Sequence, residues 1–254
     1  MTRQLPVGAC LRHALQSVRN SIRQAFRVSW PWVLLLGVLG AIVVAFVSYA
    51  VEESFMAGFL VVLVWMLAAM LAGAAIAVHW HRYILLDEVS SLGAVLRLDG
   101  KIWRYFGNVL LIALAVSAVQ LLVAIPARAV AWGTGAGEVV ESILSLIMAL
   151  VGGVLSYRLG VKLPAIALDR RDFRFSHAWE ATRGNDLRLL SVFLIQLAAT
   201  LAIILVPYIA LLLLPPIIAV AGFVILLVFL WLISIFNITI LTSLYGFFVE
   251  NRDF

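Results

Sequence analysis

The stretch FMAGFLVVLVWMLAAMLAGAAIAV, from Phe55 to Val78, contains no charged residue. A helix rises about 1.5 Å per residue, so this run is long enough to cross a hydrocarbon core roughly 30 Å thick. The run is continuously apolar and does not alternate between apolar and polar residues, which favours a helix over a strand of a membrane barrel. The stretch therefore predicts a transmembrane helix.

Five further segments have the same character, so we expect six spans. The other predicted spans are about Trp32–Val51, Val109–Ala129, Val139–Leu168, Leu190–Leu214 and Ile218–Leu244. Short connections at 52–54, 130–138 and 215–217 join the spans in pairs, as three antiparallel hairpins. The predicted fold class is an all-α integral membrane protein that forms a single membrane domain over residues 1–254.

The composition supports this fold class. Apolar residues make up 65% of the 254 residues, charged residues 12%, and the mean hydropathy is +1.12. A soluble domain has about 45–50% apolar and about 25% charged residues. The composition thus excludes a soluble globular enzyme, a disordered chain and a nucleic-acid-binding domain, so we expect no nucleic acid partner despite the net charge of +5.

The basic residues are sorted to one side of the predicted spans. Of the 18 lysines and arginines, only Arg128 falls on the other side, where Glu52, Glu53, Glu138 and Glu141 also lie. Because basic residues stay on the cytoplasmic side of a membrane, both termini are expected in the cytoplasm. The short outer connections indicate a bacterial inner membrane.

An amphipathic surface helix is predicted before each hairpin. Leu11, Leu15, Val18, Ile22 and Phe26 form one apolar stripe at helical spacing, and similar stretches begin at Ser91 and Ser176. Such helices lie in the membrane surface with their basic residues near anionic phospholipid headgroups. The basic residues expected there are Arg12, Arg19, Arg23, Arg27, Lys101, Arg104, Arg183 and Arg188.

Three similar helix ends indicate an internal repeat. RYILLDE (82–88), PAIALDR (164–170) and GFFVENR (246–252) each place an apolar run before an acid. The acids are Asp87, Asp169 and Glu250, which are 82 and 81 positions apart. This spacing predicts three copies, at about 8–88, 91–170 and 175–254. The alternative is that any six-span chain has such a rhythm.

Arg158 and Lys162 are the leading candidates for a ligand site. They lie four residues apart, on one face of the fourth predicted helix, just before Pro164. Pro164 removes a backbone donor and is expected to kink the helix. The kinked, doubly basic helix end could hold a phosphate or a phospholipid headgroup. The alternative is that both side chains extend to the cytoplasmic headgroups.

Further polar residues suggest a vestibule open to the cytoplasm. His79 is predicted at a depth similar to that of Lys162, and the last span carries Asn237 and Thr239. With Arg158 and Lys162 these residues could line such a vestibule. Alternatively, polar groups such as these, together with Gln120 and Gln196, hydrogen-bond between helices.

Small residues mark positions where helices are expected to pack closely. Gly152 and Gly153 form such a patch on the fourth predicted helix. Glycines in transmembrane helices allow a neighbouring helix to approach, and no phosphate-binding glycine motif is present.

Motifs for chemistry are absent. His79 and His81 are two residues apart, so on a helix they point to nearly opposite sides and are poorly placed to bind one metal. We find no catalytic triad and no metal-ligand spacing. The sequence therefore predicts a protein that is not an enzyme, with no cofactor and no metal.

One stretch resembles a known family. RLGVKLPAIALDRRDFRFSHAWEATRGNDLRLL (158–190) combines a proline–apolar–acid helix end with a following surface helix that contains Ser176, Trp179 and Gly184. This resembles the YciC-type family of bacterial inner-membrane proteins and the membrane domain that precedes some glycerophosphodiester phosphodiesterases. The specific likeness covers 164–184 and the topology covers the whole chain. The resemblance implies no established activity, and six spans leave no room for a catalytic barrel.

The sequence therefore predicts a six-span inner-membrane protein with one of two roles. The first is to bind a lipid or another anionic amphiphile, or to act as a partner subunit of other membrane proteins. The alternative is a small transporter with a vestibule that faces the cytoplasm.

Overall fold

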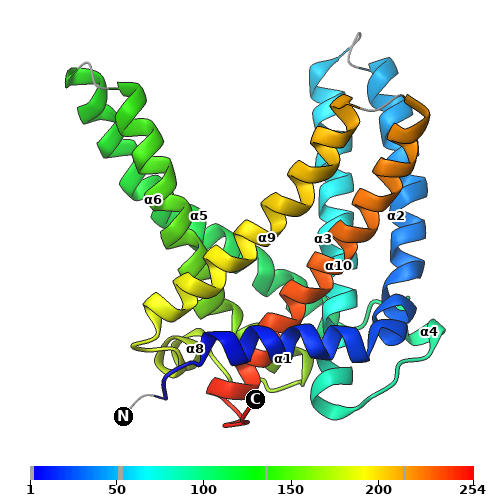
Figure 1. The fold of residues 1–254 in the computed structure, drawn as a ribbon, viewed down its shortest axis with the longest axis vertical. Helices are drawn as coiled ribbons and strands as arrows, with labels where there is room; N and C mark the ends of the chain where they lie inside the picture. The colour runs from blue at the N-terminus through cyan, green and yellow to red at the C-terminus, as the bar shows by residue number, and fades with distance from the viewer. Residues whose placement is uncertain (1–2, 51–53, 135–136, 214–215) are drawn as a thin grey trace.

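A computed structural model describes residues 3–50, 54–134, 137–213 and 216–254 (Figure 1). In these ranges every regular element is an α-helix. The helices are α1 (Val7–Asn20), α2 (Ile22–Ala50), α3 (Phe55–Leu86), α4 (Leu92–Val95), α5 (Gly100–Thr134), α6 (Gly137–Gly160), α7 (Lys162–Ala167), α8 (Phe175–Ala181), α9 (Asp186–Leu213) and α10 (Pro216–Phe248).

Six of the helical segments are long and apolar enough to cross a membrane, which confirms the predicted number of spans. The helices extend beyond the predicted apolar runs, since α3 continues to Leu86 and α5 begins at Gly100. The predicted connection at 130–138 is mostly helical, because α5 continues to Thr134. Residues 52–53 and 215 of the other two predicted connections lie outside the described residues, and α10 already begins at Pro216.

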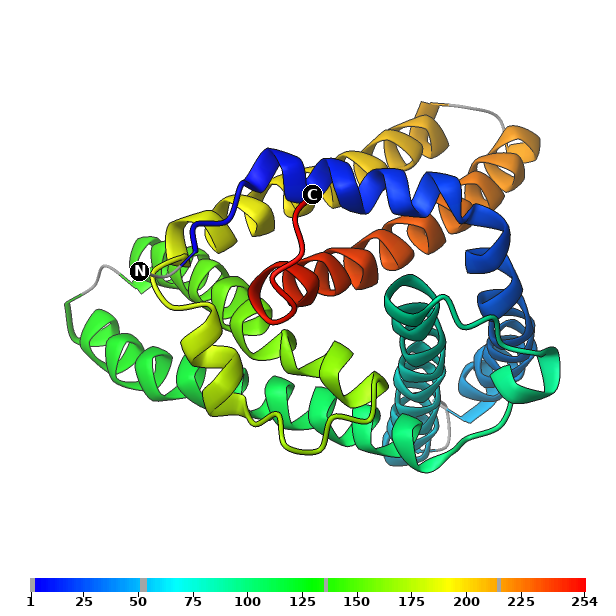
Figure 2. The same cartoon turned by 90° about the horizontal axis from the view of Figure 1, so that it is seen from below.

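The long helices contact one another in consecutive pairs, α2 with α3, α5 with α6 and α9 with α10. The pairs converge at one end of the molecule and spread apart toward the other: α5 and α6 diverge from the other pairs in Figure 1, and α9 and α10 diverge from α2 and α3 in Figure 2. We call these the convergent end and the divergent ends. The short helices α1, α4 and α8 lie at the convergent end, as do both termini (Figures 1 and 2).

The buried core lies near the convergent end. Its three clusters draw on α1, on the ends of α3 and α10, and on α7, with Ala14, Trp80, Ala165 and Tyr245 among the fully buried side chains. In contrast, in the most apolar window of each candidate span only 11 to 22% of the residues are buried. The pairs are therefore held to one another mainly at this end, and the rest of each pair presents an apolar surface.

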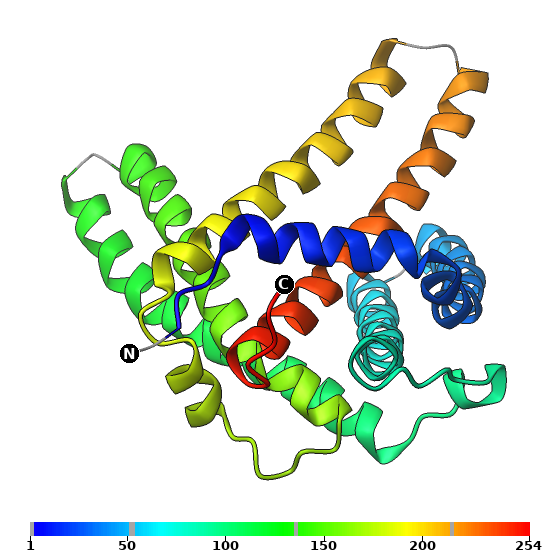
Figure 3. The same ribbon diagram turned by 60° about the horizontal axis from the view of Figure 1, so that its bottom comes forward.

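Helix α1 crosses the convergent end and packs on α10 and α9 (Figure 3). Its buried face consists of Cys10, Ala14 and Val18, while Leu15 is 61% exposed. The predicted apolar stripe is divided between two elements, because α1 ends at Asn20 and Ile22 begins α2. The buried Cys10 thiol has its pKa raised to about 12 by desolvation, so it is a packing residue in its neutral form.

The second surface segment is much shorter than predicted. After Ser91 there is a single helical turn, α4, and Lys101 and Arg104 belong to the long helix α5. The reason is a helix cap, since the Asp99 carboxylate accepts the backbone N–H groups of Lys101 and Ile102 at 3.0 and 3.1 Å. An aspartate in this role starts a helix directly after itself.

Candidate functional site

Three helix exits meet at the convergent end, and each contains a residue with left-handed backbone. These residues are Asp87, Asp169 and Asn251, with φ of 56°, 61° and 55°. They are 82 positions apart in both intervals. Aspartate and asparagine adopt this conformation more readily than other residues with a side chain. The third exit position is therefore Asn251, one residue beyond the predicted Glu250.

Three arginines link these exits to one another. Arg82 donates to the carbonyl oxygen of Ala167 at 2.9 Å, from the first exit to the second. Arg170 pairs with Glu250 at 3.4 Å, from the second exit to the third. The third contact closes the cycle, because Arg252 donates to the carbonyl oxygen of Leu85 at 3.2 Å.

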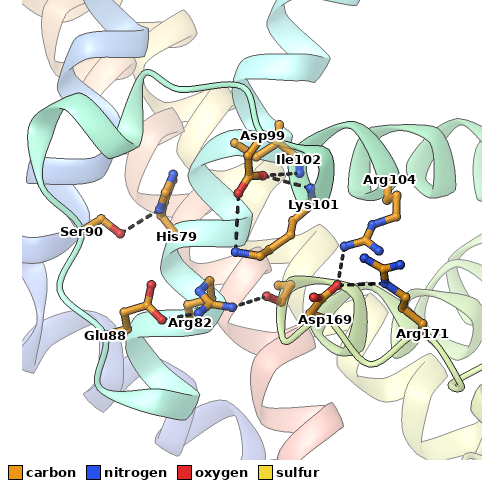
Figure 4. Close-up of polar contacts among 11 residues, drawn as sticks. His79, Arg82, Glu88, Ser90, Asp99, Lys101, Ile102, Arg104, Asp169 and Arg171 are labelled. Carbon is orange, nitrogen blue, oxygen red and sulfur yellow. Dashed lines mark hydrogen bonds and ion pairs between the residues drawn. The ribbon is translucent and has the colours of Figure 1, made fainter.

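The start of α5 stands beside the first two exits (Figure 4). Lys101 pairs with Asp99 at 3.5 Å, and Arg104 pairs with Asp169. Arg171 also approaches Asp169, at 3.5 Å. The hydrogen bond from Arg104 holds the pKa of the Asp169 carboxyl below its usual range. Asp169 therefore stays charged and fixes two arginines near α5.

A cavity of about 350 Å³, which we call the basic cavity, lies between α5 and the segment after α7. It presents five cationic side chains and a single carboxylate, that of Asp169. Its lining residues are Arg104, Asn108, Lys162, Ile166, Asp169, Arg170, Arg171, Phe173 and Arg174.

Part of this positive charge has no acidic partner in the described residues. Lys162 lies over the Phe175 ring, with Nζ 3.8 Å from the ring centroid, and forms no ion pair there. Arg174 likewise has no carboxylate partner within the described ranges. The Nε atom of Arg104 is buried and unpaired in this part of the chain. Unpaired donors of this kind favour a bound anion, because a buried unsatisfied donor costs about 1–3 kcal/mol.

A second cavity of about 670 Å³, which we call the mixed-charge cavity, lies between the end of α3 and the start of α5. It combines cations, carboxylates and a histidine. Its lining residues are Val78, His79, Arg82, Glu88, Val89, Ser90, Ser91, Ala94, Arg97, Leu98, Asp99, Gly100 and Lys101. Glu88 pairs with Arg82, whose hydrogen bond lowers the pKa of the Glu88 carboxyl.

Arg158, a predicted ligand residue, is instead buried and satisfied within the fold. Its guanidinium pairs with Asp186 at 2.8 Å and donates to Thr182 Oγ1 at 3.2 Å. It also donates to the carbonyl oxygen of Trp179 at 3.0 Å and lies 3.7 Å from that ring's centroid. Because its donors are engaged, Arg158 fastens α6 to α8 and α9.

Lys162 has a different environment from Arg158, although the two were predicted on one helix face. The helix is interrupted between them, since α6 ends at Gly160 and α7 begins at Lys162. Pro164 accounts for the interruption, because it has no N–H to donate to the carbonyl of Gly160 and its ring crowds that carbonyl. Lys162 therefore faces the basic cavity.

The predicted vestibule residues have different surroundings. His79 lines the mixed-charge cavity, where Nδ1 is 2.8 Å from Ser90 Oγ, whereas Lys162 lines the basic cavity. Thr239 is fully buried and accepts a hydrogen bond from the Trp80 indole at 2.8 Å. Asn237 is half-buried in α10, and its buried Oδ1 atom has no hydrogen-bond partner among the described residues. The vestibule stays a prediction.

The remaining predicted basic residues divide into two groups. Lys101 and Arg104 line the two cavities, and Arg188 donates to the carbonyl oxygen of Leu5 at 2.6 Å. The others are exposed at the convergent end: Arg12, Arg19, Arg23, Arg27 and Arg183.

Sequence reasoning did not predict the role of two features of this end. One is the group of Arg170, Arg171 and Arg174, which follows the second of the repeated helix ends and lines the basic cavity. The other is His81, which is fully buried between Thr242 Oγ1 at 2.8 Å and the Tyr105 hydroxyl at 3.1 Å. No pattern in the sequence singles out these two partners.

Comparisons of the chain with protein-family models, with curated proteins and with solved structures find no significant match. Within the described residues, no group of three histidine, cysteine, aspartate or glutamate side chains is arranged to hold a metal ion. The candidate site therefore rests on the two cavities and their charges.

Proposed function

We propose that this protein is a six-span inner-membrane protein that binds the headgroup of an anionic phospholipid on its cytoplasmic side. The observation that carries the proposal is the basic cavity, where five cationic side chains face one carboxylate. Such an excess of one charge in a hollow concentrates ions of the opposite sign. Guanidinium groups match the geometry of phosphate oxygens, which they bind in pairs.

Exposed tryptophans on α5 and α8 support a position of the convergent end at the membrane interface. Trp103, which precedes Arg104, is 51% exposed, and Trp179 of α8 is 43% exposed. Tryptophan concentrates at the level of the lipid headgroups, where its ring is half in apolar surroundings. A basic cavity at this depth meets phosphate groups and not acyl chains.

The proposed topology is three antiparallel hairpins with surface segments at the cytoplasmic face. The equal spacing of Asp87, Asp169 and Asn251, and the cycle of arginine contacts between the exits, support a threefold repeat near 8–88, 91–170 and 175–254. The basic residues sorted to one side support cytoplasmic termini. Labelling of single cysteines placed near residues 4 and 253, in inverted and right-side-out vesicles, tests the orientation.

The resemblance to the YciC-type family, including the membrane domain that precedes some phosphodiesterases, remains part of this proposal. Its support is the proline–apolar–acid helix end at 164–169, before the third surface segment. That same stretch forms the wall of the basic cavity, from Lys162 to Arg174.

Native mass spectrometry in a mild detergent tests lipid binding. The double variant Lys162→Gln/Arg174→Gln removes two cations that have no acidic partner in the described structure. We expect it to bind phosphatidylglycerol at least about tenfold more weakly than the unmodified protein, since each charge-assisted hydrogen bond contributes about 1.5–3 kcal/mol.

The matched control is Arg19→Gln/Arg183→Gln, which removes the same charge from exposed positions outside both cavities. This control variant is expected to bind phosphatidylglycerol as tightly as the unmodified protein does. Phosphatidylcholine, which has no net charge, is expected to bind both proteins equally. Equal weakening by the two double variants would contradict a defined site and leave only general surface attraction.

A second role, as a partner subunit of other membrane proteins, is favoured by a separate observation. A groove of about 510 Å³ lies between α5 and α6, within the candidate spans, and is lined in part by Ser117 and Ser145. Gln120 also lines it, but its amide donates to the carbonyl oxygen of Met148 in α6 at 3.1 Å. Polar groups at such a depth commonly face another helix. Cross-linking in native membranes from a cysteine at position 117 tests this role. The transporter alternative has less support, because Arg158 and Thr239, two of the residues predicted to line its vestibule, have partners on other helices.

A further inference from the structure

The mixed-charge cavity differs from the basic cavity in both position and charge. It lies on the other side of the start of α5 and shares no lining residue with the basic cavity. Three cations, two carboxylates and a histidine line it. We infer that this cavity binds a phosphoethanolamine group, which carries a phosphate and a primary ammonium, as the headgroup of phosphatidylethanolamine.

Arg97 and His79 supply donors for the phosphate. Arg97 is exposed, and no acidic partner for it lies in the described part of the chain. The His79 Nε2 atom is buried and forms no hydrogen bond of standard geometry among those residues, although the Ala94 backbone lies near the ring. Nδ1 lies 2.8 Å from Ser90 Oγ. When Nδ1 accepts a hydrogen bond from the Ser90 hydroxyl, the neutral imidazole carries its hydrogen on Nε2, which can then donate a hydrogen bond. A phosphate oxygen can satisfy that donor.

Glu88 and Asp99 supply acceptors for the ammonium group. Glu88 binds Arg82, and Asp99 binds Lys101 and also accepts the two backbone N–H groups that start α5. Their side chains nevertheless remain 47% and 41% exposed. A carboxylate has room for about four hydrogen bonds, so each can accept more. A primary ammonium has three N–H donors, whereas the quaternary ammonium of phosphatidylcholine has none. The cavity therefore distinguishes the two headgroups by hydrogen bonding.

The rim of the cavity favours a lipid over a soluble molecule. Val89 and Leu98 line the cavity and are 56% and 38% exposed. Leu92 and Leu96, on the same segment, are 44% and 47% exposed. A polar interior beside exposed apolar side chains suits an amphiphile at the membrane surface. The volume of about 670 Å³ is within the range of small-molecule sites.

Native mass spectrometry with phosphatidylethanolamine and phosphatidylcholine of identical acyl chains tests the inference. We expect the unmodified protein to bind phosphatidylethanolamine about tenfold more tightly, the worth of one charge-assisted hydrogen bond. Glu88→Gln is expected to reduce this preference, because Asp99 then remains as the one charged acceptor of the lining, and Glu88→Asp is expected to retain it. Arg97→Gln is expected to weaken the binding of both lipids about tenfold, because both lipids carry the phosphate.

Two controls separate this site from the basic cavity and from soluble ligands. Lys162→Gln/Arg174→Gln keeps the preference for phosphatidylethanolamine, even where it loses phosphatidylglycerol. Soluble glycerophosphoethanolamine at the concentration of the lipid is expected to leave the bound lipid in place. The inference is overturned if the unmodified protein binds the two lipids equally, if Glu88→Gln keeps the full preference, or if the soluble compound displaces the lipid.

Discussion

The convergent end and the divergent ends of this molecule are built on different principles. At the convergent end, hydrogen bonds, ion pairs and small buried residues fix one helix against the next, as Arg158 and His81 show. At the divergent ends the helices expose large apolar residues, such as Leu60 and Leu114, at 50% and 66%. Inside a bilayer such residues gain little from packing on one another, because lipid tails are equally apolar.

This contrast indicates which contacts determine how the helices of this protein are placed relative to one another. Apolar composition determines that a segment spans the bilayer, and it leaves the relative placement of segments open. Polar contacts at the convergent end supply that placement. The two cavities occur at the same end, so the groups that fix the fold also surround the candidate ligand sites.

The largest effect is expected at Arg158. Arg158→Ala removes an ion pair with Asp186 and two hydrogen bonds, and leaves Thr182 and the Trp179 carbonyl with fewer partners. We expect it to lower the free energy of unfolding by about 2–4 kcal/mol. Unfolding in mixed detergent micelles measures this, with the exposed Arg23→Ala as the control. A loss as small as that of the control would contradict the role given to Arg158.

The next effect concerns the contact between α6 and α9. A Cβ atom at Gly153 would lie 2.5 Å from the base of the Phe193 ring, whereas one at Gly73 meets nothing within 4 Å. Gly153→Ala is therefore expected to destabilise the fold by about 1–3 kcal/mol. Gly73→Ala should be neutral or stabilising, since alanine is the better helix former. Melting temperatures compare the two, and equal shifts would count against close packing at this contact.

A third pair of substitutions compares the two ends directly. Ile240 is fully buried near the convergent end, and Leu60 is half-exposed toward a divergent end. Ile240→Ala should cost about 1–2 kcal/mol, mainly through the cavity it leaves. Leu60→Ala should cost under about 0.5 kcal/mol. The unfolding assay in mixed detergent micelles measures both losses of free energy. A larger loss for Leu60→Ala than for Ile240→Ala would contradict the difference between the two ends.

The smallest effect is a pH dependence at the packed termini. His13 lies 3.0 Å from Ser243 Oγ, and burial, followed by the nearby charge of Arg252, lowers its pKa below the ordinary 6.5. A lowered pKa means that the folded state favours neutral histidine, so this stability is present above pH 6.5 and declines as pH falls through the folded-state pKa.

Acidification from pH 7.5 to 5.5 should therefore lower the melting temperature by about 1–2 °C more in the unmodified protein than in His13→Gln. Differential scanning fluorimetry at the two pH values measures the difference. An identical pH response in both proteins would exclude His13 as its source.

The sequence predicted the spans well because a span depends on local composition. Continuous apolar runs such as 55–78 mark the spans, and only their ends moved, where helices such as α3 continue to Leu86. The surface segments were predicted from apolar residues at helical spacing, and this spacing did not determine the lengths of the helices. There α4 ends at Val95, and the Asp99 cap starts α5 at Gly100.

The site was predicted less well because it depends on contacts between distant residues. Arg158 was expected at a headgroup, but Asp186, on another helix, binds it. Lys162 was expected beside Arg158, but the interruption before Pro164 separates them. The third exit shifted from Glu250 to Asn251, since the left-handed position depends on backbone geometry and not on charge.

Photo-crosslinking tests the central claim, that the basic cavity holds an anionic headgroup, most directly. A phosphatidylglycerol analogue with a diazirine at its headgroup, incorporated with the protein into nanodiscs, is activated by light and its attachment sites are mapped by peptide sequencing. The account predicts attachment concentrated at 104–108 and 162–174, and its loss in Lys162→Gln/Arg174→Gln. Attachment spread evenly over the exposed arginines of α1 and α2, and unchanged in that variant, would contradict it.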